Sequence, residues 1–344
     1  MAKASKKSEG LDLPGFSLIK NNPLYQTPMD YLHTGNYILN WAIANDAKRG
    51  WPLGRIVELY GDPSTGKSLL AFQAMAAMQR RGGMVLLEDV EHAFDPRFGE
   101  LLGLDTEKVL ISSSKTLEDC FSNINRSMAQ MSKAGVDHAV FVLDSLGMLS
   151  SKHEEDVGFD KRDMTKAVLI RQGMRMLLQQ FANTRYLLIV LNHSTSNIGD
   201  PINPRTTPGG SGVKFAASVR VELRYGGKLP GKPPKGVYTR FKVSKNRVAP
   251  PFREGLLRIL FASGVTPWSG TADSLINAEM LEKDKRGFVT FSTGERHRLS
   301  SFDEQFPSIA KGLGYDDPAE ALNAMLCDSS TDEEENTEGE EDEE

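Results

Sequence analysis

The eight residues Gly61-Asp-Pro-Ser-Thr-Gly-Lys-Ser68 constrain the fold of this chain more than any other segment. An apolar, β-branched run precedes them at 55–60, and a run typical of a helix follows at 69–78. Between a strand and a helix, this spacing of glycines and lysine predicts a phosphate-binding loop. Gly61 and Gly66 allow backbone angles that turn successive N–H groups toward a phosphate at the helix N-terminus. The alternative is a chance glycine-rich turn ahead of a helix.

Two side chains of this loop carry the expected chemistry. Lys67 is expected to reach the terminal phosphates of a nucleotide, and Ser68 is expected to ligate magnesium. The predicted nucleotide-binding residues of the loop are Gly61, Asp62, Pro63, Ser64, Thr65, Gly66, Lys67, Ser68 and Leu69.

Two further apolar runs predict buried strands that end in polar residues. The run at 138–143 is followed by Asp144, and the run at 186–191 is followed by Asn192 and His193. Because ligands of open α/β sheets bind at the carboxyl ends of the strands, we expect Asp144 to coordinate or orient magnesium. Its alternative role is to cap the next turn. Buried strands that alternate with helical segments predict an α/β fold with a doubly wound, mostly parallel sheet.

Three carboxylates near the end of the run at 85–90 are candidates for activating water. A general base must lie within about 3 Å of a water in line with the terminal phosphate, and a strand end beside the phosphate loop allows this. Strand alternation places Asp89 and Glu91 on one side and Glu88 on the other, without choosing between them. For Glu91 the alternative is an ion pair with Arg97.

These motifs and several others together resemble the bacterial and phage RecA-type recombinases. The matching blocks follow the family in order and spacing over residues 34–261, which is most of the chain. The resemblance implies a P-loop NTPase fold of the RecA type. The blocks are Gly54-Arg-Ile-Val-Glu-Leu-Tyr-Gly61 with the phosphate loop, Asp89-Val-Glu-His-Ala-Phe-Asp-Pro96, Val142-Leu-Asp-Ser145, Leu188-Ile-Val-Leu-Asn192, Thr206-Thr-Pro-Gly-Gly210, Val213-Lys-Phe-Ala-Ala-Ser-Val-Arg220 and Val243-Ser-Lys-Asn-Arg247.

The resemblance implies an enzyme, a DNA-dependent ATPase that uses ATP and Mg2+. Such a protein forms a helical filament on single-stranded DNA and exchanges strands with a homologous duplex in recombination and repair. Its expected partners are single-stranded and double-stranded DNA, further copies of the chain, and single-strand-binding and loader proteins. Two alternatives remain, namely a RecA-fold motor or regulator without recombinase activity, and a DNA-binding accessory protein that does not exchange strands.

The resemblance also implies roles for single residues. In this family the Glu that matches Glu91 activates the attacking water, and residues that match Asp95 and Phe98 contact the adenine. Basic residues that match Lys245 and Arg247 reach the nucleotide of the neighbouring subunit. Arg247 stands where the family has Lys, and it keeps the positive charge.

His193 departs from the family pattern, which has a Gln that senses the terminal phosphate. A neutral imidazole can make one hydrogen bond to the phosphate or its water, but the charge of histidine changes near pH 6.5. We therefore predict a catalytic role for His193 that depends on pH or is coupled differently. The alternative is a histidine whose hydrogen bonds are satisfied in the core.

Two loops that follow strands are expected to bind DNA, at 151–164 and 194–212. The first is acidic, so its basic residues and those of the following helix would make the contacts. The second is unusually long for a compact domain, and its glycines, hydroxyls and isoleucines suit contacts to phosphates and bases. The alternative is a disordered surface loop. The predicted DNA-binding residues are Arg162, Met164, Arg171, Arg175, Ile198, Ile202, Arg205, Gly209 and Gly210.

The two ends of the chain predict smaller parts beside an ATPase core at 34–268. Residues 1–33 are expected to form a short arm for polymerisation, with a strand at 16–20 that adds to a neighbour's sheet edge. Three prolines between 11 and 30 exclude a continuous helix there. Residues 269–327 are expected to form a reduced carboxyl lobe that captures duplex DNA, with a helix at 272–283 and a hairpin strand at 287–294.

An acidic segment at 328–344 masks the charge of the rest of the chain. It holds eleven acids and no base, so 35 acids and 41 Lys and Arg remain in residues 1–327, which carry about +6 against −5 for the whole. The body is mildly basic, as is typical of a DNA-binding protein. Like-charge repulsion is expected to keep the segment disordered. We expect it to compete with DNA for basic surface; the alternative is a solubility tail.

The composition argues against secreted and membrane classes. Two cysteines far apart in sequence, Cys120 and Cys327, give neither a disulfide framework nor a metal-binding spacing. No apolar run reaches eighteen residues, and the first residues lack the apolar segment of a signal peptide. With 39% apolar and 25% charged residues over 344 positions, the chain can bury one large core. We expect a cytoplasmic location, in a bacterium or a phage-infected host.

Overall fold

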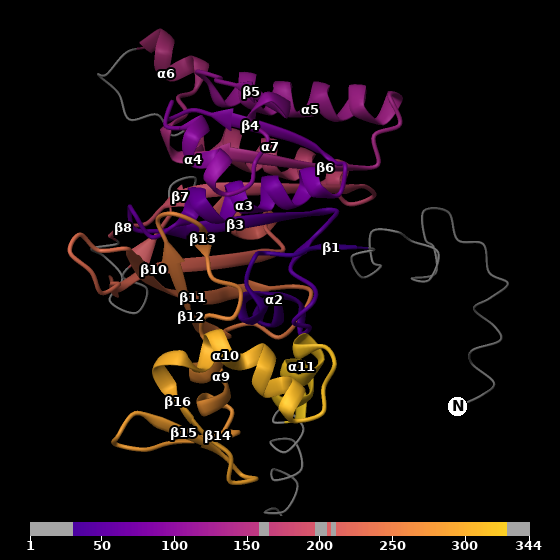
Figure 1. The fold of residues 1–344 in the computed structure, drawn as a ribbon. Helices are drawn as coiled ribbons and strands as arrows, with labels where there is room; N and C mark the ends of the chain where they lie inside the picture. The colour runs from indigo at the N-terminus through magenta and orange to yellow at the C-terminus, as the bar shows by residue number, and fades with distance from the viewer. Residues whose placement is uncertain (1–29, 158–164, 197–204, 208–210, 329–344) are drawn as a thin grey trace, which may run out of the picture.

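A nine-stranded sheet dominates the computed structural model, which describes residues 30–157, 165–196, 205–207 and 211–328 (Figure 1). From one edge to the other its strands are β13 (Gly264–Val265), β12 (Glu254–Leu260), β11 (Gly236–Asn246), β10 (Val219–Lys228), β3 (Arg55–Gly61), β7 (Arg185–His193), β6 (His138–Asp144), β4 (Met84–Asp89) and β5 (Val109–Ser112). The strands from β10 to β5 run parallel, and β11, β12 and β13 continue the sheet antiparallel. The predicted α/β fold with a mostly parallel sheet is confirmed.

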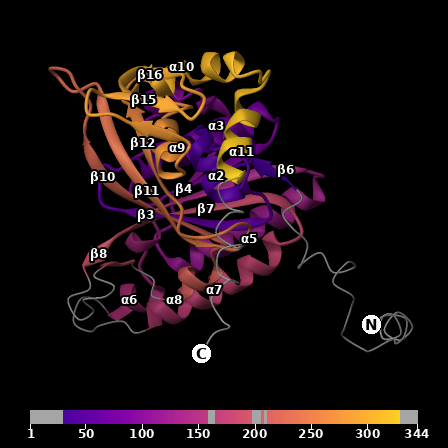
Figure 2. The ribbon, with the colours of Figure 1, turned by 90° about the horizontal axis from the view of Figure 1, so that it is seen from below.

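Helices cover both faces of this sheet (Figure 2). On one face lie α2 (Tyr37–Ala44) and α3 (Lys67–Arg80), and on the other lie α5 (Leu117–Lys133), α7 (Thr165–Phe181) and α8 (Ser211–Ala216). The central strands carry continuous apolar runs because both of their faces are buried. Within β3, Leu59 points to the first layer and Ile56 to the second.

Shorter elements connect these layers at the surface. They are β1 (Tyr31–Leu32) paired with β2 (Trp51–Pro52), α4 (Pro96–Leu101), the 3₁₀ turns η3 (Thr106–Lys108) and η4 (Leu146–Met148), α6 (Lys152–Val157), and β8 (Thr195–Ser196) paired with β9 (Arg205–Thr206).

Both predicted DNA loops are shorter than expected, because a helix occupies part of each. Ser151 and Glu154 form a reciprocal capping box that starts α6 inside the first loop, and α8 begins at Ser211 inside the second.

The carboxyl lobe combines helices with a three-stranded sheet. Its elements are α9 (Thr271–Asn277), β14 (Leu281–Lys283), β15 (Phe288–Phe291), β16 (Arg296–Arg298), α10 (Leu299–Gly312) and α11 (Pro318–Asp328). The helix expected at 272–283 is therefore too long. It ends at Asn277 because Glu279 takes a positive φ of 60°, and Leu281–Lys283 pairs antiparallel with β15.

Contacts at the start of α2 hold the segment that leads into this lobe. Asn36 Nδ2 donates to the backbone oxygens of Thr266, Pro267 and Ser269, each at 3.0 Å. Tyr37 stacks on Trp268, with ring centroids 3.8 Å apart.

The lobe and the core also share one hydrophobic cluster. Phe302 and Phe306 of α10 are fully buried in the cluster that contains α3 and one face of the central sheet. The ATPase core and the lobe therefore do not have separate hydrophobic cores on the two sides of the expected boundary near residue 268.

Several expectations for the ends of the chain lie outside the described residues. These are the strand at 16–20, nearly all of the amino-terminal arm, and the acidic segment beyond Asp328. Among the residues that the structure describes, no helix is long and apolar enough to cross a membrane.

Candidate nucleotide site

The phosphate loop lies between β3 and α3, at the carboxyl edge of the sheet. Gly61 and Gly66 both take positive φ, at 152° and 91°. A Cβ on Gly61 would lie 2.0 Å from the Leu223 carbonyl oxygen, and one on Gly66 would lie 2.5 Å from Ile259 Cδ1. Both positions require glycine, because the loop packs directly against β10 and β12.

Lys67 directs its amine into the loop. Its Nζ donates to the carbonyl oxygens of Gly61 at 3.1 Å and of Asp62 at 2.7 Å, and the residue is buried. Burial lowers the pKa of Lys67, and the nearby carboxylates of Asp144, Glu91 and Asp62 oppose that shift. The lysine occupies the place that the spacing predicts for a phosphate contact.

Ser68 and Asp144 meet beside the loop. Ser68 Oγ donates to Asp144 Oδ2 at 2.9 Å, which joins the first turn of α3 to the end of β6. Burial raises the pKa of Asp144, and the charges of Glu91 and Asp89 add to the shift. A bound cation would offset the repulsion between these carboxylates. A hydroxyl and a carboxylate next to a phosphate loop fit Mg2+, which prefers oxygen ligands and is commonly held by one or two carboxylates plus phosphates.

Glu91 stands next to these groups and is held by two side chains. Ser145 donates a short hydrogen bond from its hydroxyl to Glu91 Oε1, and His193 Nε2 lies 3.0 Å from the same oxygen. Burial raises the pKa of the Glu91 carboxyl, but the contacts with Ser145 and His193 and the charge of Lys67 outweigh it and lower the pKa. Glu91 is therefore an ionised, oriented carboxylate at the carboxyl edge of β4, β6 and β7. Its partners are these two residues, and the expected alternative with Arg97 does not form.

The other two candidate carboxylates have structural tasks. Asp89 ends β4, and its two oxygens accept from the backbone N–H groups of Ala93 and Phe94, each at 3.2 Å. Glu88 accepts from Ser114 N at 2.5 Å. β4 ends at Asp89, two residues before Glu91, so alternation within the strand does not reach Glu91.

The residues expected near an adenine lie at the start of α4. Asp95 caps this helix by accepting from Arg97 N at 2.9 Å. Phe98 is half-buried and makes an edge contact with Phe72, with ring centroids 6.4 Å apart. The helix cap accounts for Asp95 without a ligand, so contact with adenine stays a prediction.

Lys245 and Arg247 lie at the far side of β10 and β3, away from Glu91 in the sheet order. Lys245 Nζ donates to the last carbonyls of α8, Lys214 O at 2.6 Å and Phe215 O at 3.1 Å. Burial lowers the pKa of Lys245 to about 8, and the charges of Arg247 and Arg220 add to the shift. The structure thus does not bring these two residues to the subunit's own phosphate loop.

Few of the predicted DNA-binding residues fall among the described side chains. Arg171 and Arg175 lie on the exposed side of α7, the helix that follows the first loop. The backbone of Arg205 pairs with Ser196 in the short β8–β9 ribbon. The residues outside the described part are Arg162, Met164, Ile198, Ile202, Gly209 and Gly210.

Two features of the site were not predicted. The role of Ser145 went unnoticed, although it follows Asp144 directly, because only the folded structure brings it to Glu91. A buried network of Glu58, Arg220 and Asn192 was also missed. A glutamate inside an otherwise apolar strand was the available signal, because charged residues are rarely buried without a partner.

Comparison with known proteins agrees with this geometry. The family model described as RecA N-terminal domain matches residues 16–266. Protein RecA of Thermus thermophilus is 36% identical over 260 residues, which cover 74% of each chain. Protein RecA of Methylococcus capsulatus is 35% identical over 258 residues, which cover 74% of this chain and 72% of its own. The chain belongs to the RecA family of recombinases, DNA-dependent ATPases that act in DNA recombination and repair.

Proposed function

We propose that this recombinase hydrolyses ATP with Glu91 as the residue that activates the attacking water. ATP would bind along residues 61–69, with Lys67 on its terminal phosphates and with Ser68 and Asp144 holding Mg2+. The ion supplies charge neutralisation at the phosphates. Asp95 and Phe98 would contact the adenine.

The position of Glu91 supports this assignment more than any other observation. Its carboxylate is ionised, shares the edge of the sheet with Lys67, and is fixed by Ser145 and His193. A base held in one orientation keeps its water aligned with the phosphate, which is the geometric condition for general base catalysis. Glu88 and Asp89 are committed to backbone N–H groups.

The neighbouring subunit in a filament would complete the site. We propose that its Lys245 and Arg247 offer positive charge to the phosphates as hydrolysis proceeds. Their distance from the subunit's own loop in the strand order supports a role across the interface. Arg247 keeps a permanent charge and a bidentate fork where the family has Lys.

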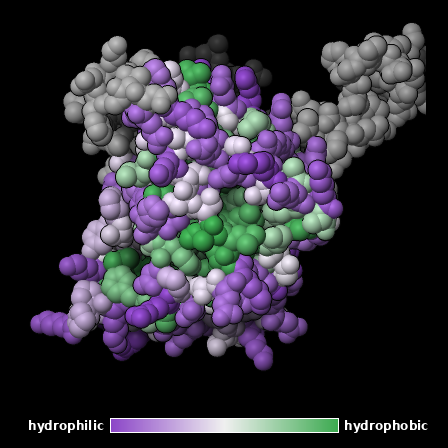
Figure 3. Space-filling view, turned by 90° about the horizontal axis from the view of Figure 1, so that it is seen from above, coloured by the Kyte–Doolittle hydropathy of each residue, from purple (hydrophilic) through white to green (hydrophobic). Residues whose placement is uncertain are grey.

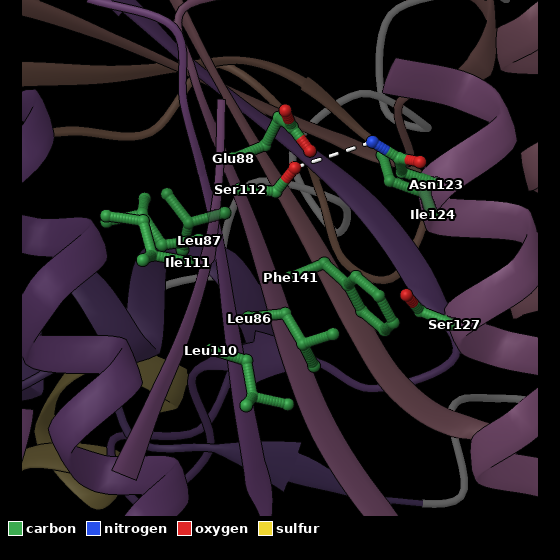
Figure 4. A pocket seen from close by; sticks show the side chains of 11 residues that line it. Leu86, Leu87, Glu88, Leu110, Ile111, Ser112, Asn123, Ile124, Ser127 and Phe141 are labelled. Carbon is green, nitrogen blue, oxygen red and sulfur yellow. Dashed lines mark hydrogen bonds between the residues drawn. The ribbon is translucent and has the colours of Figure 1, made fainter. Parts of the chain in front are cut away.

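A hydrophobic strip on β5 is the surface that we propose for filament assembly. β5 is an edge strand, and Leu110 and Ile111 are 51% and 57% exposed. Figure 3 shows an apolar area on the side of the molecule that carries β5. Beside the strip, a pocket of about 170 Å³ opens between β4, β5 and α5; Leu86, Leu110 and Phe141 line its apolar part, and Glu88, Ser112 and Asn123 its polar end (Figure 4).

The proposed occupant of this strip is the segment 16–20 of a second copy, Phe16-Ser-Leu-Ile-Lys20. An extended segment adds to an exposed sheet edge through its backbone, and alternate side chains enter pockets. Nine residues, 21–29, separate it from Asp30, and these ten residue steps can span about 33 Å when extended. A Leu110→Lys, Ile111→Lys variant should lose filaments on DNA in electron micrographs, whereas Met176→Lys, on α7, should keep them. Filaments of normal length in the double variant would exclude this surface.

DNA would contact the two loops at 151–164 and 194–212 through the basic and apolar residues predicted above. The exposed Arg171 and Arg175, which follow the first loop on α7, support this placement. Within this scheme the carboxyl lobe captures duplex DNA, the acidic segment at 328–344 competes for basic surface, and single-strand-binding and loader proteins assist assembly in the cytoplasm.

A single substitution separates water activation from nucleotide binding. Glu91→Gln keeps the size and one acceptor oxygen of the side chain but cannot take a proton. It should bind a fluorescent ATP analogue as wild type does, while its turnover falls by about 10²–10⁴-fold. Glu107→Gln, at an exposed position of η3, is the matched control and should turn over normally. Normal turnover in Glu91→Gln would require another residue as the base.

A further inference from the structure

A buried ion pair joins the strands behind the candidate site, and no step proposed above uses it. Glu58 of β3 and Arg220 of β10 pair through side chains that are 0% and 7% exposed. Burying two charges costs about as much free energy as their attraction returns, so such pairs are weak stabilisers. Stability alone therefore does not explain a charged pair in the centre of the sheet.

On one side, this pair holds the end of β7. Asn192 Nδ2 donates to Glu58 Oε1 at 3.1 Å, and the guanidinium of Arg220 pairs with the other carboxylate oxygen. Asn192 directly precedes His193, whose Nε2 is 3.0 Å from Glu91. The carboxylate of Glu58 thus contacts the residue that directly precedes His193, and His193 orients the proposed base.

On the other side, the pair holds the end of β11. The guanidinium carbon of Arg220 lies 4.5 Å from the centroid of the Tyr60 ring, and the Tyr60 hydroxyl donates to Ser244 Oγ at 2.8 Å. Ser244 Oγ in turn donates to the Arg220 carbonyl at 3.3 Å. Ser244 directly precedes Lys245, and Lys245 is the register partner of Arg220.

We propose that Glu58 and Arg220 form a positioning unit that fixes the strand end carrying His193 relative to the strand end carrying Lys245. Through this unit, the nucleotide site of one subunit is coupled to the basic residues that the same subunit offers to its neighbour. The charge of Arg220 also reaches Lys245 directly, because it helps to lower the pKa of that amine while Glu58 opposes the shift. The inference rests on the proposed roles of His193 and Lys245.

The test replaces both charges in the full-length chain, as Glu58→Met with Arg220→Met. Apolar replacement of a buried ion pair is often neutral or stabilising, so the double variant should keep or raise the Tm. If the pair only fills space, the double variant will hydrolyse ATP with wild-type kinetics. We expect the DNA-stimulated kcat to fall by about tenfold with KM for ATP near wild type, and the Hill coefficient for ATP to fall toward one.

Two further variants keep the outcome unambiguous. Asn192→Ala leaves the ion pair intact and removes only its link to β7, and it should give the same loss of kcat. Asp137→Asn with Arg185→Gln removes an ion pair of 2.8 Å at the opposite, amino edge of the sheet, and it should behave as wild type.

Wild-type kcat and cooperativity in the double Met variant overturn the inference. Full activity in Asn192→Ala overturns it as well, even if the double variant does not fold. If wild type and the control pair show no DNA-stimulated hydrolysis at all, the proposed function fails, and the inference fails with it.

Discussion

At the scale of single residues, the site depends on how firmly His193 and Ser145 hold Glu91. His193→Ala removes one of the two contacts, and a hydrogen bond to a charged group contributes about 1.5–3 kcal/mol. We expect kcat to fall by at least about tenfold with little change in KM for ATP, because the phosphate loop is untouched. His193→Gln restores a donor and should recover most of the rate in a steady-state assay with single-stranded DNA. An equal loss in both variants would argue against positioning by a hydrogen bond.

Lys245 is expected to make both the free energy of unfolding and the activity depend on pH. Its pKa of about 8 lies below the ordinary lysine value of 10.5, so the fold favours the neutral amine. Between these two values the unfolded chain binds more protons, and this residue makes the free energy of unfolding rise with pH. Activity should move the other way, because the amine loses the charge offered to a neighbour's phosphates as pH rises through 8.

The matching measurement is kcat/KM for ATP with single-stranded DNA, followed from about pH 6.5 to 9.5. Wild type should lose rate above pH 8, whereas Lys245→Arg stays charged and should hold its rate. The same alkaline fall in both proteins would assign the titration to another group.

At the scale of elements, the strand-loop-helix unit was predictable because glycine spacing and apolar runs are local properties of the sequence. The choice between Asp89 and Glu91 was not predictable. It depends on where β4 ends and on which carboxylate accepts hydrogen bonds from the backbone that follows. The helix α6 carried a local signal, the Ser-x-x-Glu capping box, within a segment assigned to a loop. Pairing partners such as Ser145 and Arg220 come from other strands, and periodicity carries no information about them.

Gly66 of the phosphate loop has no room for a side chain. Gly66→Ala places a methyl group 2.5 Å from Ile259 Cδ1 at a φ of 91°. Strain of this kind costs about 1–3 kcal/mol and shifts the backbone N–H groups that face the phosphates. Affinity for a fluorescent ATP analogue and Tm should both fall. Gly82→Ala, also at positive φ but with open space around it, should lower Tm less and leave nucleotide affinity unchanged.

At the scale of the whole molecule, the core and the carboxyl lobe should unfold together. Phe302 is fully buried in the cluster that both share, and removing such a ring costs about 3–5 kcal/mol. Phe302→Ala should therefore lower the midpoint of a single denaturant transition followed by both nucleotide binding and circular dichroism. Phe252→Ala, at a side chain that is 65% exposed, should change the free energy of unfolding by less than about 0.5 kcal/mol. Two separate transitions would show that the lobe is an independent domain.

The overall architecture was predictable because a parallel sheet imposes long apolar runs and places their polar ends at one edge. Asp144 and His193 lie at that edge, where their positions after apolar runs indicated, beside Ser68 of the phosphate loop and Glu91. The way the lobe packs depends on long-range contacts such as Asn36 to Ser269, which have no local signature.

The role of Glu91 is tested most directly by the rate of ATP hydrolysis by the full-length protein with and without single-stranded DNA, measured beside Glu91→Gln. DNA should stimulate turnover in wild type, and the variant should lose this turnover although it still binds ATP. DNA-stimulated turnover that persists undiminished in Glu91→Gln would contradict this role.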